Sequence, residues 1–255
     1  MRTPLIAANW KMHKTLEEAV SFVSRFAVLA PERKIETVIC PAFVHLAAVG
    51  EACRKNGIKL GAQNLFWEAA GAFTGEVSPP MLKDLGVDYV IIGHSERREH
   101  FAETDQQISR KVKAAFQFDL VPILCVGETL EQRRANRTME VIAGQVSTAL
   151  HGLNAASVRK MVIAYEPVWA IGSGLSAAGS DAGAAGKRIR AVIGEMFSLE
   201  AADAVRILYG GSVQAENIAD FLRETEIDGA LVGGASLAAD SFARLVSRAQ
   251  EAVTV

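Results

Sequence analysis

The sequence predicts an α/β fold in the form of one closed (β/α)8 barrel, with eight parallel strands ringed by helices. The length of 255 residues suits one such barrel. Short apolar runs alternate with amphipathic stretches from end to end. Polar residues follow many of these runs, whereas an open doubly wound sheet, the competing architecture, would gather them behind one or two strands. We therefore expect residues 1–255 to form a single catalytic domain.

Eight short apolar runs are the predicted strands. Several are almost entirely apolar, which is typical of parallel strands covered on both faces. The first is not followed by the GxGxxG turn that a dinucleotide-binding sheet would carry. In chain order the predicted strands are Leu5–Trp10, Thr37–Pro41, Ile58–Gln63, Tyr89–Gly93, Val121–Val126, Met161–Tyr165, Val205–Tyr209 and Gly229–Val232.

Helical patterns fill the intervals between these runs. Thr15 is placed to cap the first helix, whose first turn carries Glu17 and Glu18 where the helix dipole favours acidic side chains. The Ala-, Gly- and Ser-rich stretch Ser176–Gly186 is interpreted as the exit from an active-site loop followed by a weak helix start. The predicted helices are Leu16–Leu29, Leu46–Lys55, Asp105–Phe118, Leu130–Leu150, Ala185–Phe197, Ala215–Leu222 and Ser241–Ala252.

The composition narrows the class of protein. With 27 basic and 29 acidic residues, the chain has no electrostatic signature of binding to nucleic acid or to an anionic membrane, although one local site can still hold a small anion. No apolar run reaches the ~18 residues of a membrane span. The three cysteines are odd in number and lack CxxC spacing, which argues against a disulfide framework and a zinc site. We expect a cytoplasmic protein without metal or cofactor.

Asn9 and Lys11 end the first predicted strand. At positions i and i+2 they would share one face of the strand and aim an amide and an ammonium at one point. An ammonium there suits a phosphate or a developing oxyanion. An isolated lysine is more often a surface residue, so the pattern alone leaves both interpretations open.

His94 and Glu166 follow the fourth and sixth strands. His94 precedes a helical turn, whose N–H groups and dipole would favour a neutral imidazole that donates a hydrogen bond to a carbonyl oxygen. Glu166 closes an apolar strand, and desolvation strengthens a carboxylate as a general base. Each has a structural alternative, because a lone histidine is commonly structural and a strand-end glutamate can simply pair with a basic residue.

Glycine-rich segments complete the pattern. The apolar stretch 168–174, with Gly172 and Gly174, predicts a mobile lid, with an ordinary turn as the alternative. Gly-Gly turns after the seventh and eighth strands, at 210–211 and 233–234, are a phosphate-site pattern in barrels. A base, a neutral electrophile, a cation, a lid and a phosphate cup suit proton abstraction next to the carbonyl of a small phosphate ester.

Seven segments spread over the whole chain resemble the triosephosphate isomerase family, in that family's order. They are Ala8–Met12, Gly61–Asn64, Gly71–Glu76, Ile92–Arg98, Ala164–Gly172, Tyr209–Val213 and Val232–Leu237. The resemblance implies a TIM barrel enzyme of glycolysis and gluconeogenesis. Such an enzyme interconverts dihydroxyacetone phosphate and D-glyceraldehyde 3-phosphate through an enediol(ate), and acts without a cofactor.

The same resemblance implies a role for each matching residue. Glu166 would move the proton between carbons, while neutral His94 polarises or protonates the two oxygens. Lys11 would balance negative charge, and Asn9 would hydrogen-bond the reacting oxygens. Phosphate would be held by amides at Gly172, Ser212, Gly233 and Gly234, with Ser173 nearby, while Ser95 and Glu96 would support the set, Ser95 by holding Glu166 in the open state.

The resemblance also implies a homodimer. The loop at about Phe66–Pro79 would reach into the other subunit, where Thr74 would lie near Asn9 and Lys11 of that subunit. The aromatic residues of this loop independently indicate an interface. One departure concerns the lid, which commonly ends in Lys-Thr-Ala in the family and here ends in Leu175-Ser176-Ala177. Lid closure, rather than proton transfer, is therefore the step expected to differ.

Two other functions are weighed against the isomerase. A barrel aldolase of the class I type would need a Schiff-base lysine at a strand end, and Lys11 is the one lysine expected near the mouth. A non-catalytic scaffold could use the same barrel. The presence of Asn9, Lys11, His94 and Glu166 together argues against a scaffold.

Overall fold

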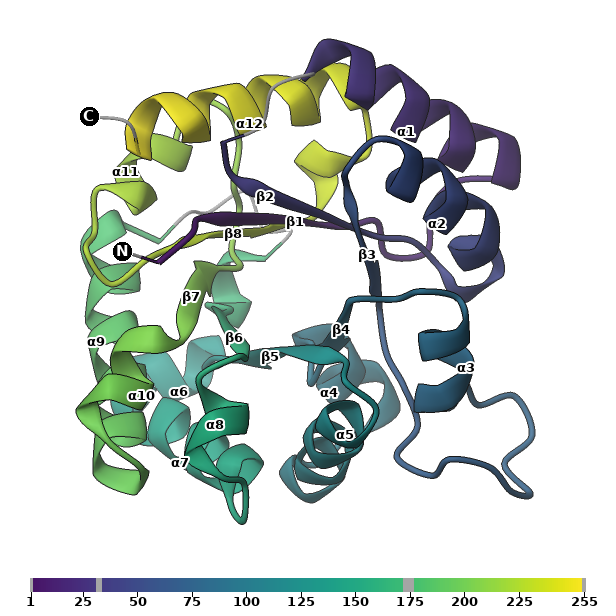
Figure 1. Cartoon of the computed structure of the whole chain (residues 1–255). Helices are drawn as coiled ribbons and strands as arrows, with labels where there is room; N and C mark the ends of the chain where they lie inside the picture. The colour runs from purple at the N-terminus through teal and green to yellow at the C-terminus, as the bar shows by residue number, and fades with distance from the viewer. Residues whose placement is uncertain (1, 31–33, 172–176, 254–255) are drawn as a thin grey trace.

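The computed structural model describes residues 2–30, 34–171 and 177–253, which form a closed barrel of eight parallel strands ringed by helices (Figure 1). Each strand pairs with the next in the sequence, and β1 pairs with β8 to close the barrel. The predicted fold class is confirmed, and all eight predicted strands overlap observed ones. The strands are β1 Leu5–Asn9, β2 Glu36–Cys40, β3 Lys59–Ala62, β4 Tyr89–Ile92, β5 Val121–Val126, β6 Val162–Tyr165, β7 Arg206–Tyr209 and β8 Gly229–Val232.

Twelve α-helices lie in the described part of the chain. Within it, none is both long and apolar enough to cross a membrane. Thr15 caps α1 as predicted, in a capping box with Glu18. The helices are α1 Leu16–Leu29, α2 Leu46–Lys55, α3 Pro79–Asp84, α4 Ser95–Phe101, α5 Asp105–Gln117, α6 Leu130–Arg134, α7 Thr138–Leu150, α8 Ala155–Val158, α9 Gly179–Met196, α10 Leu199–Ala204, α11 Ile218–Leu222 and α12 Ala239–Val253.

Two predicted helices differ most from the structure. The single helix predicted over Leu130–Leu150 is divided into α6 and α7, because Asn136 takes a left-handed φ of 56° between them. The helix predicted to start at Ala185 starts at Gly179. The glycines at its start allow close packing: a Cβ on Gly183 would lie 2.3 Å from a carboxylate oxygen of Glu224. A helix therefore does start within the predicted stretch, and its glycines serve close packing.

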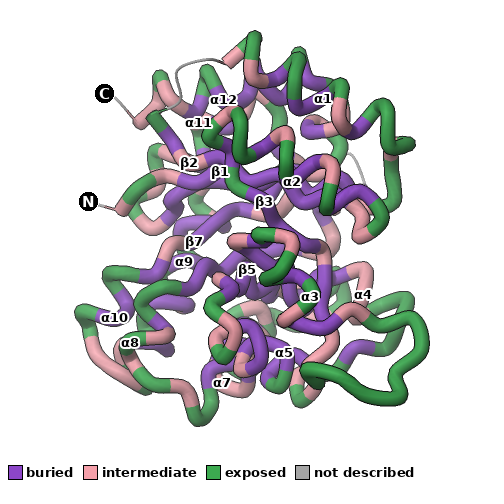
Figure 2. The backbone as a smooth tube through the Cα atoms, turned by 45° about the vertical axis from the view of Figure 1, so that its right-hand side comes forward, coloured by how far each residue is buried: buried purple, intermediate pink, exposed green. Residues whose placement is uncertain are grey.

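The strands divide the core into two layers. Along β1, Leu5 and Ala7 join the cluster inside the barrel, while Ile6 and Ala8 join the cluster between the barrel and the helices. Figure 2 shows the strands as buried segments surrounded by helices with exposed outer faces. Because alternate residues serve two apolar layers, the strand sequences are continuous apolar runs.

A first polar group closes the inside of the barrel at the strand starts. The Glu36 cluster consists of Glu36, Tyr89 and Arg206, the first residues of β2, β4 and β7. The Tyr89 hydroxyl donates to the Glu36 carboxylate and accepts a hydrogen bond from Arg206 at 2.8 Å. Arg206 also donates to Glu36 at 3.3 Å. Each polar group is therefore paired within the cluster.

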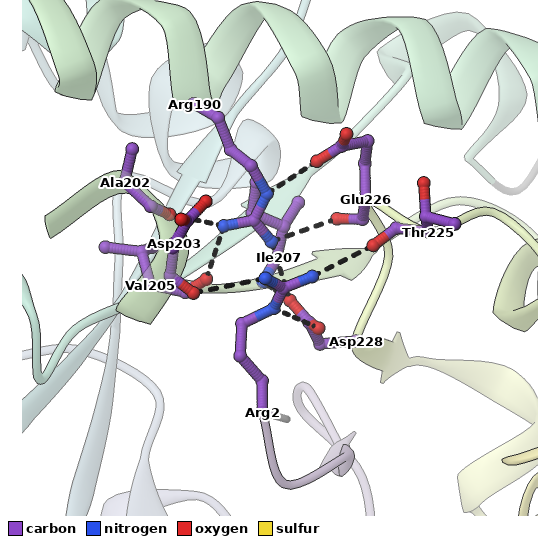
Figure 3. Close-up of polar contacts among 9 residues, drawn as sticks. All are labelled: Arg2, Arg190, Ala202, Asp203, Val205, Ile207, Thr225, Glu226 and Asp228. Carbon is purple, nitrogen blue, oxygen red and sulfur yellow. Dashed lines mark hydrogen bonds and ion pairs between the residues drawn. The ribbon is translucent and has the colours of Figure 1, made fainter. Parts of the chain in front are cut away.

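A second polar group lies just before two strand starts. The Arg190 cluster consists of Arg190, Glu226, Asp228 and Arg2 (Figure 3). Arg190, from α9, donates to Glu226 at 2.6 Å and to Asp228 at 3.0 Å, and it also donates to backbone carbonyls. Asp228 further accepts from Arg2 at 2.6 Å and from the backbone N–H of Ile207 at 2.8 Å. The cluster thereby ties α9 to the starts of β1, β7 and β8.

Candidate active site

A cavity of about 710 Å³ lies at the opposite end of the barrel, where the strands end. Seven of the residues predicted for the site line it, and they come from five different strand ends. They are Asn9, Lys11, His94, Glu166, Ser212, Gly233 and Gly234. A barrel builds its site from these loops, so the placement matches the predicted site.

Glu166 is the buried carboxylate of this cavity, with 2 % of its surface exposed. Its backbone N–H donates to the Val126 carbonyl at 2.8 Å, which continues the strand pairing beyond β6. Oε2 accepts the Ser95 backbone N–H at 2.9 Å. Oε1 lies 3.0 Å from Nε2 of His94 and accepts no hydrogen bond from the described residues. One carboxylate oxygen is thus anchored while the other is available to take a proton.

Two glycines make room for Glu166. A Cβ on Gly127 would lie 1.7 Å from the Glu166 carbonyl oxygen, and a Cβ on Gly210 would lie 2.9 Å from its Cγ. The Gly210 N–H donates to the Tyr165 carbonyl at 2.7 Å, which fixes this close approach. A glycine at 210 is therefore needed for the position of the carboxylate as well as for the turn that follows β7.

His94 is the N-cap residue of α4. Its Nδ1 accepts the backbone N–H of Glu96 at 3.2 Å, as an N-cap acceptor does. An acceptor nitrogen carries no proton, so the proton of the neutral imidazole belongs to Nε2. Nε2 is the nitrogen on the side of Glu166, and His94 lines the cavity. The ring is therefore oriented to donate a hydrogen bond from Nε2.

Lys11 reaches the cavity by a turn and not by strand alternation, so the predicted i, i+2 geometry is wrong. β1 ends at Asn9, and Lys11 takes a left-handed φ of 53°. The Lys11 N–H donates to Oδ1 of Asn9 at 3.1 Å. The Gln63 amide donates to the carbonyls of Lys11 and Cys40, each at 2.9 Å. These bonds hold a backbone conformation that a lysine rarely adopts.

The Lys11 ammonium pairs with Glu96, whose carboxylate oxygen lies 2.5 Å from Nζ. Partial burial acts to raise the pKa of Glu96, but the hydrogen bond from Lys11 and the nearby positive charges outweigh it, so that the pKa lies below its ordinary value. The carboxylate therefore stays ionised and holds the ammonium in place near the cavity. Glu96 was predicted to support the site, and its contact with Lys11 shows how it can do so.

The two Gly-Gly turns form one wall of the cavity. The Ser212 hydroxyl donates to the Ala170 carbonyl at 2.8 Å, which links the turn after β7 to the segment that follows Glu166. The backbone N–H of Ala177 donates to the Tyr209 hydroxyl at 3.3 Å. Gly172 and Ser173, also predicted to hold phosphate, lie outside the described residues, as do Leu175 and Ser176 of the lid end.

Thr74 is separate from this cavity. It is exposed in the long loop between β3 and α3. Figure 1 shows this loop extending outward from the barrel. Phe66, Trp67 and Phe73 pack together in the same loop, with ring centroids 4.1 Å and 4.5 Å apart. The loop is thus an ordered aromatic unit that presents Thr74 to the outside.

The sequence analysis missed Glu128, a fully buried carboxylate two residues after β5. It accepts hydrogen bonds from the Tyr165 hydroxyl at 3.1 Å and from the Trp169 indole at 2.8 Å. It therefore contacts the residue directly before Glu166 and the segment after it. Its position behind an apolar strand is the same signal that identified Glu166. Within the described ranges, no three His, Cys, Asp or Glu side chains are grouped to hold a metal ion.

Comparison with known proteins agrees with this geometry. The family model described as triosephosphate isomerase matches residues 4–249. A triosephosphate isomerase of Clostridium perfringens is 54% identical over 247 residues, which cover 97% of this chain and 100% of that protein. The proteins of the same name from Caldanaerobacter subterraneus subsp. tengcongensis and Dictyoglomus turgidum are 52% and 55% identical, over 97% and 95% of this chain and 100% and 98% of their own lengths. With a match along nearly its whole length and the buried carboxylate, imidazole and ammonium at one barrel mouth, this chain is an isomerase that belongs to the triosephosphate isomerase family.

Proposed function

We propose that the single barrel domain interconverts dihydroxyacetone phosphate and D-glyceraldehyde 3-phosphate, with Glu166 as the base. The observation that carries the proposal is the Glu166 carboxylate: it is buried beside the cavity, anchored through Oε2 and without a hydrogen bond on Oε1. A carboxylate held in this way at the cavity is placed to take a proton from a bound substrate, as a general base does. The substrate is a small molecule, in keeping with a cavity of about 710 Å³.

Four residues take part in the proton transfer. Glu166 removes a proton from the carbon next to the carbonyl group and returns it to the neighbouring carbon. His94, with its proton on Nε2, donates to the oxygen that becomes negative in the enediolate. The Lys11 ammonium balances the charge of the enediolate and the phosphate. The Asn9 amide, whose oxygen already accepts the Lys11 N–H, orients the reacting oxygens.

Phosphate binding falls to the glycine-rich wall of the cavity. The backbone amides of Ser212, Gly233 and Gly234 are assigned to the phosphate oxygens, because amides without bulky side chains can approach an anion closely. Gly172 and Ser173 are assigned to the same anion from the lid. Ser95 keeps Glu166 in its present position through the backbone N–H, and Glu96 keeps Lys11 in place.

We also propose that the protein is a cytoplasmic homodimer. The aromatic loop that carries Thr74, in which Phe66, Trp67 and Phe73 pack together and Phe73 is exposed, supports a protein interface. The three cysteines are buried and none of them forms a disulfide, which supports a reducing compartment. Sedimentation equilibrium checks the dimer, and a mass of 27.3 kDa at micromolar concentration would contradict it.

The test of the reaction is conversion of D-glyceraldehyde 3-phosphate to dihydroxyacetone phosphate, coupled to NADH oxidation. Glu166→Gln keeps the shape of the side chain and removes the base, so we expect kcat to fall by about 10²- to 10⁴-fold. Glu140→Gln, on the exposed face of α7, is the matched control and should keep full activity. An inactive parent, or an active Glu166→Gln variant, would contradict the proposal.

The aldolase alternative needs a separate control. Borohydride with a ketose phosphate traps a Schiff base on lysine and inactivates an aldolase, whereas the proposed isomerase keeps its activity. The Lys11 ammonium is engaged with Glu96 at 2.5 Å, and the family match gives no support to an aldolase. Inactivation by borohydride would therefore count against the whole scheme.

A further inference from the structure

Lys14 lies in the loop between β1 and α1, three residues after Lys11. It takes a left-handed φ of 77°, which residues other than glycine rarely adopt. Its side chain does not line the cavity. A residue held in an unfavourable backbone conformation outside the cavity calls for a stabilising contact elsewhere, and the side chain supplies one.

The ammonium of Lys14 is held on three sides. Nζ donates to the Leu237 carbonyl at 2.5 Å and lies 5.0 Å and 4.8 Å from the ring centroids of Trp10 and Phe22. The two rings are buried and meet edge to face, so they form a rigid support. Burial lowers the pKa of Lys14, while the charge of Glu18 acts in the opposite direction. The ammonium is thus partly desolvated and fixed.

Leu237 ends the turn that follows β8. This turn begins at Gly233 and Gly234, whose carbonyls accept the backbone N–H groups of Ser236 at 2.8 Å and Leu237 at 3.1 Å. The buried Ser236 hydroxyl also donates to the Gly233 carbonyl at 2.7 Å. A cation at the carbonyl end of such a turn is electrostatically favourable. Lys14 therefore holds the turn at the end opposite to the Gly-Gly amides.

The same two loops meet a second time inside the cavity. A Cβ on Gly233 would lie 3.4 Å from Cε of Lys11, so the Lys11 side chain runs directly beside the Gly-Gly pair. The loop after β1 thus contacts the turn after β8 through Lys11 on the cavity side and through Lys14 on the outer side.

We propose that Lys14 is a positioning residue for the phosphate of the substrate. It fixes the turn after β8 against the loop after β1, so that the amides of Gly233 and Gly234 and the ammonium of Lys11 converge on one anion. The inference rests on the proposed function, because it deepens the role assigned to that turn. Lys14 acts through Leu237 and touches no substrate.

Three variants separate the contributions of the Lys14 charge, of its hydrogen bond to the Leu237 carbonyl and of its backbone conformation. Lys14→Met keeps much of the length and apolar stem but removes the ammonium. Lys14→Arg keeps a cation that can donate to the Leu237 carbonyl. Lys14→Gly removes the side chain and relieves the left-handed backbone. Inorganic phosphate, titrated against each protein and followed by phosphorus NMR, gives a dissociation constant that does not depend on activity.

We expect Lys14→Met and Lys14→Gly to weaken phosphate binding by about tenfold and to raise KM for D-glyceraldehyde 3-phosphate in parallel, with a smaller change in kcat. Lys14→Arg should recover most of the loss. Turnover of D-glyceraldehyde, which has the reacting carbons but no phosphate, should stay within about twofold of the parent in all three variants. A loss confined to thermal stability would move none of these ratios.

The inference is overturned if Lys14→Met binds phosphate as the parent does, or if D-glyceraldehyde turnover falls as much as that of the phosphate ester. It is also overturned if Lys14→Gly binds phosphate normally. The backbone conformation at this position, and not the contact of the Lys14 side chain with Leu237, would then position the turn. Should Lys14→Met not fold, the Lys14→Gly and Lys14→Arg pair decides. An inactive parent that still binds phosphate would defeat the proposed function and leave the phosphate test intact, whereas a parent that binds no phosphate overturns this inference.

Discussion

The two ends of the barrel use polar residues in opposite ways. At the strand starts, the Glu36 and Arg190 clusters pair charged groups with one another and with backbone carbonyls. At the strand ends, Glu166 keeps one oxygen without a hydrogen bond, and Lys11 takes a left-handed backbone conformation. An unsatisfied buried group and a strained backbone both cost stability. We call the end of the barrel with the strand starts the closed end, and the end with the strand ends and the cavity the open end. The comparison indicates that the closed end stabilises the barrel, while the open end carries the chemistry.

The largest effect should come from breaking the closed end. Arg190→Met removes a buried cation that bonds to Glu226, Asp228 and backbone carbonyls, and leaves the two carboxylates short of a partner. We expect a loss of about 3–5 kcal/mol in the free energy of unfolding. Urea denaturation measures it, and the folded fraction should keep the kcat of the parent because the cluster is far from the cavity.

Arg188→Met is the matched control for this variant. Arg188 lies on the same helix but pairs with Glu195 only at 3.7 Å on a more exposed surface. Its loss should change the unfolding free energy by at most about 1 kcal/mol. Equal effects of the two substitutions would mean that the closed end has no special part in stability.

A smaller effect, in activity, should come from crowding the open end. In Gly210→Ala the new Cβ would meet Cγ of Glu166 at 2.9 Å, so the carboxylate must shift. A small misplacement of a catalytic group can cost about 10²-fold, and we expect a loss of that order in kcat. The coupled isomerase assay measures it.

Gly144→Ala controls for the substitution itself. A Cβ on Gly144 would meet nothing within 4 Å, and the residue lies inside α7. Activity should be unchanged and stability equal or higher by about 0.5–1 kcal/mol, because alanine favours a helix over glycine. If Gly210→Ala behaved like this control, the geometry of Glu166 would not depend on that glycine.

The smallest effect concerns pH. The folded pKa of Glu96 lies below its ordinary value of 4.5. Its contribution to stability is therefore fully present above pH 4.5 and is lost as the pH falls through the lowered pKa, because the unfolded chain takes up the proton first. Glu96→Gln should lose less stability than the parent on acidification, as followed by thermal unfolding. The two profiles should run parallel above that range, and parallel profiles throughout would contradict the pairing with Lys11.

The bounds of helices and strands could be predicted from the local sequence pattern where the elements are long. The strand β5 and the helices α1 and α2 have the predicted bounds, since periodicity over several turns or a full apolar run leaves little choice. The short helices α3, α4, α8 and α10 span four to seven residues, too few to show a helical period. The start of α9 was mistaken because glycine is typical both of flexible segments and of close packing, and the groups packed against these glycines, Asp220 and Glu224, are distant in the sequence.

Seven of the predicted site residues line the cavity, but the geometry of their contacts was not predictable. Asn9, Lys11, His94 and Glu166 follow apolar strands, and this topology alone brings them to one mouth. The left-handed turn at Lys11 depends on the Gln63 amide, which comes from a different strand end. The hold on Glu166 comes from a backbone N–H, and Glu128 acts through side chains on β6 and beyond. Such contacts are set by tertiary packing, which a single sequence pattern does not encode.

The pairing of β1 with β8 also has a consequence for the order of folding. Among the described strands, every other pair joins neighbours along the chain, whereas this pair joins residues 5–8 to residues 229–232. Bringing together residues so far apart in the chain costs the most loop-closure entropy, so we expect an open sheet to form first and this seam to close last. Arg2 on Asp228 and Lys14 on Leu237 fasten the two ends of the seam. Weakening either contact should speed unfolding and leave the folding rate nearly unchanged.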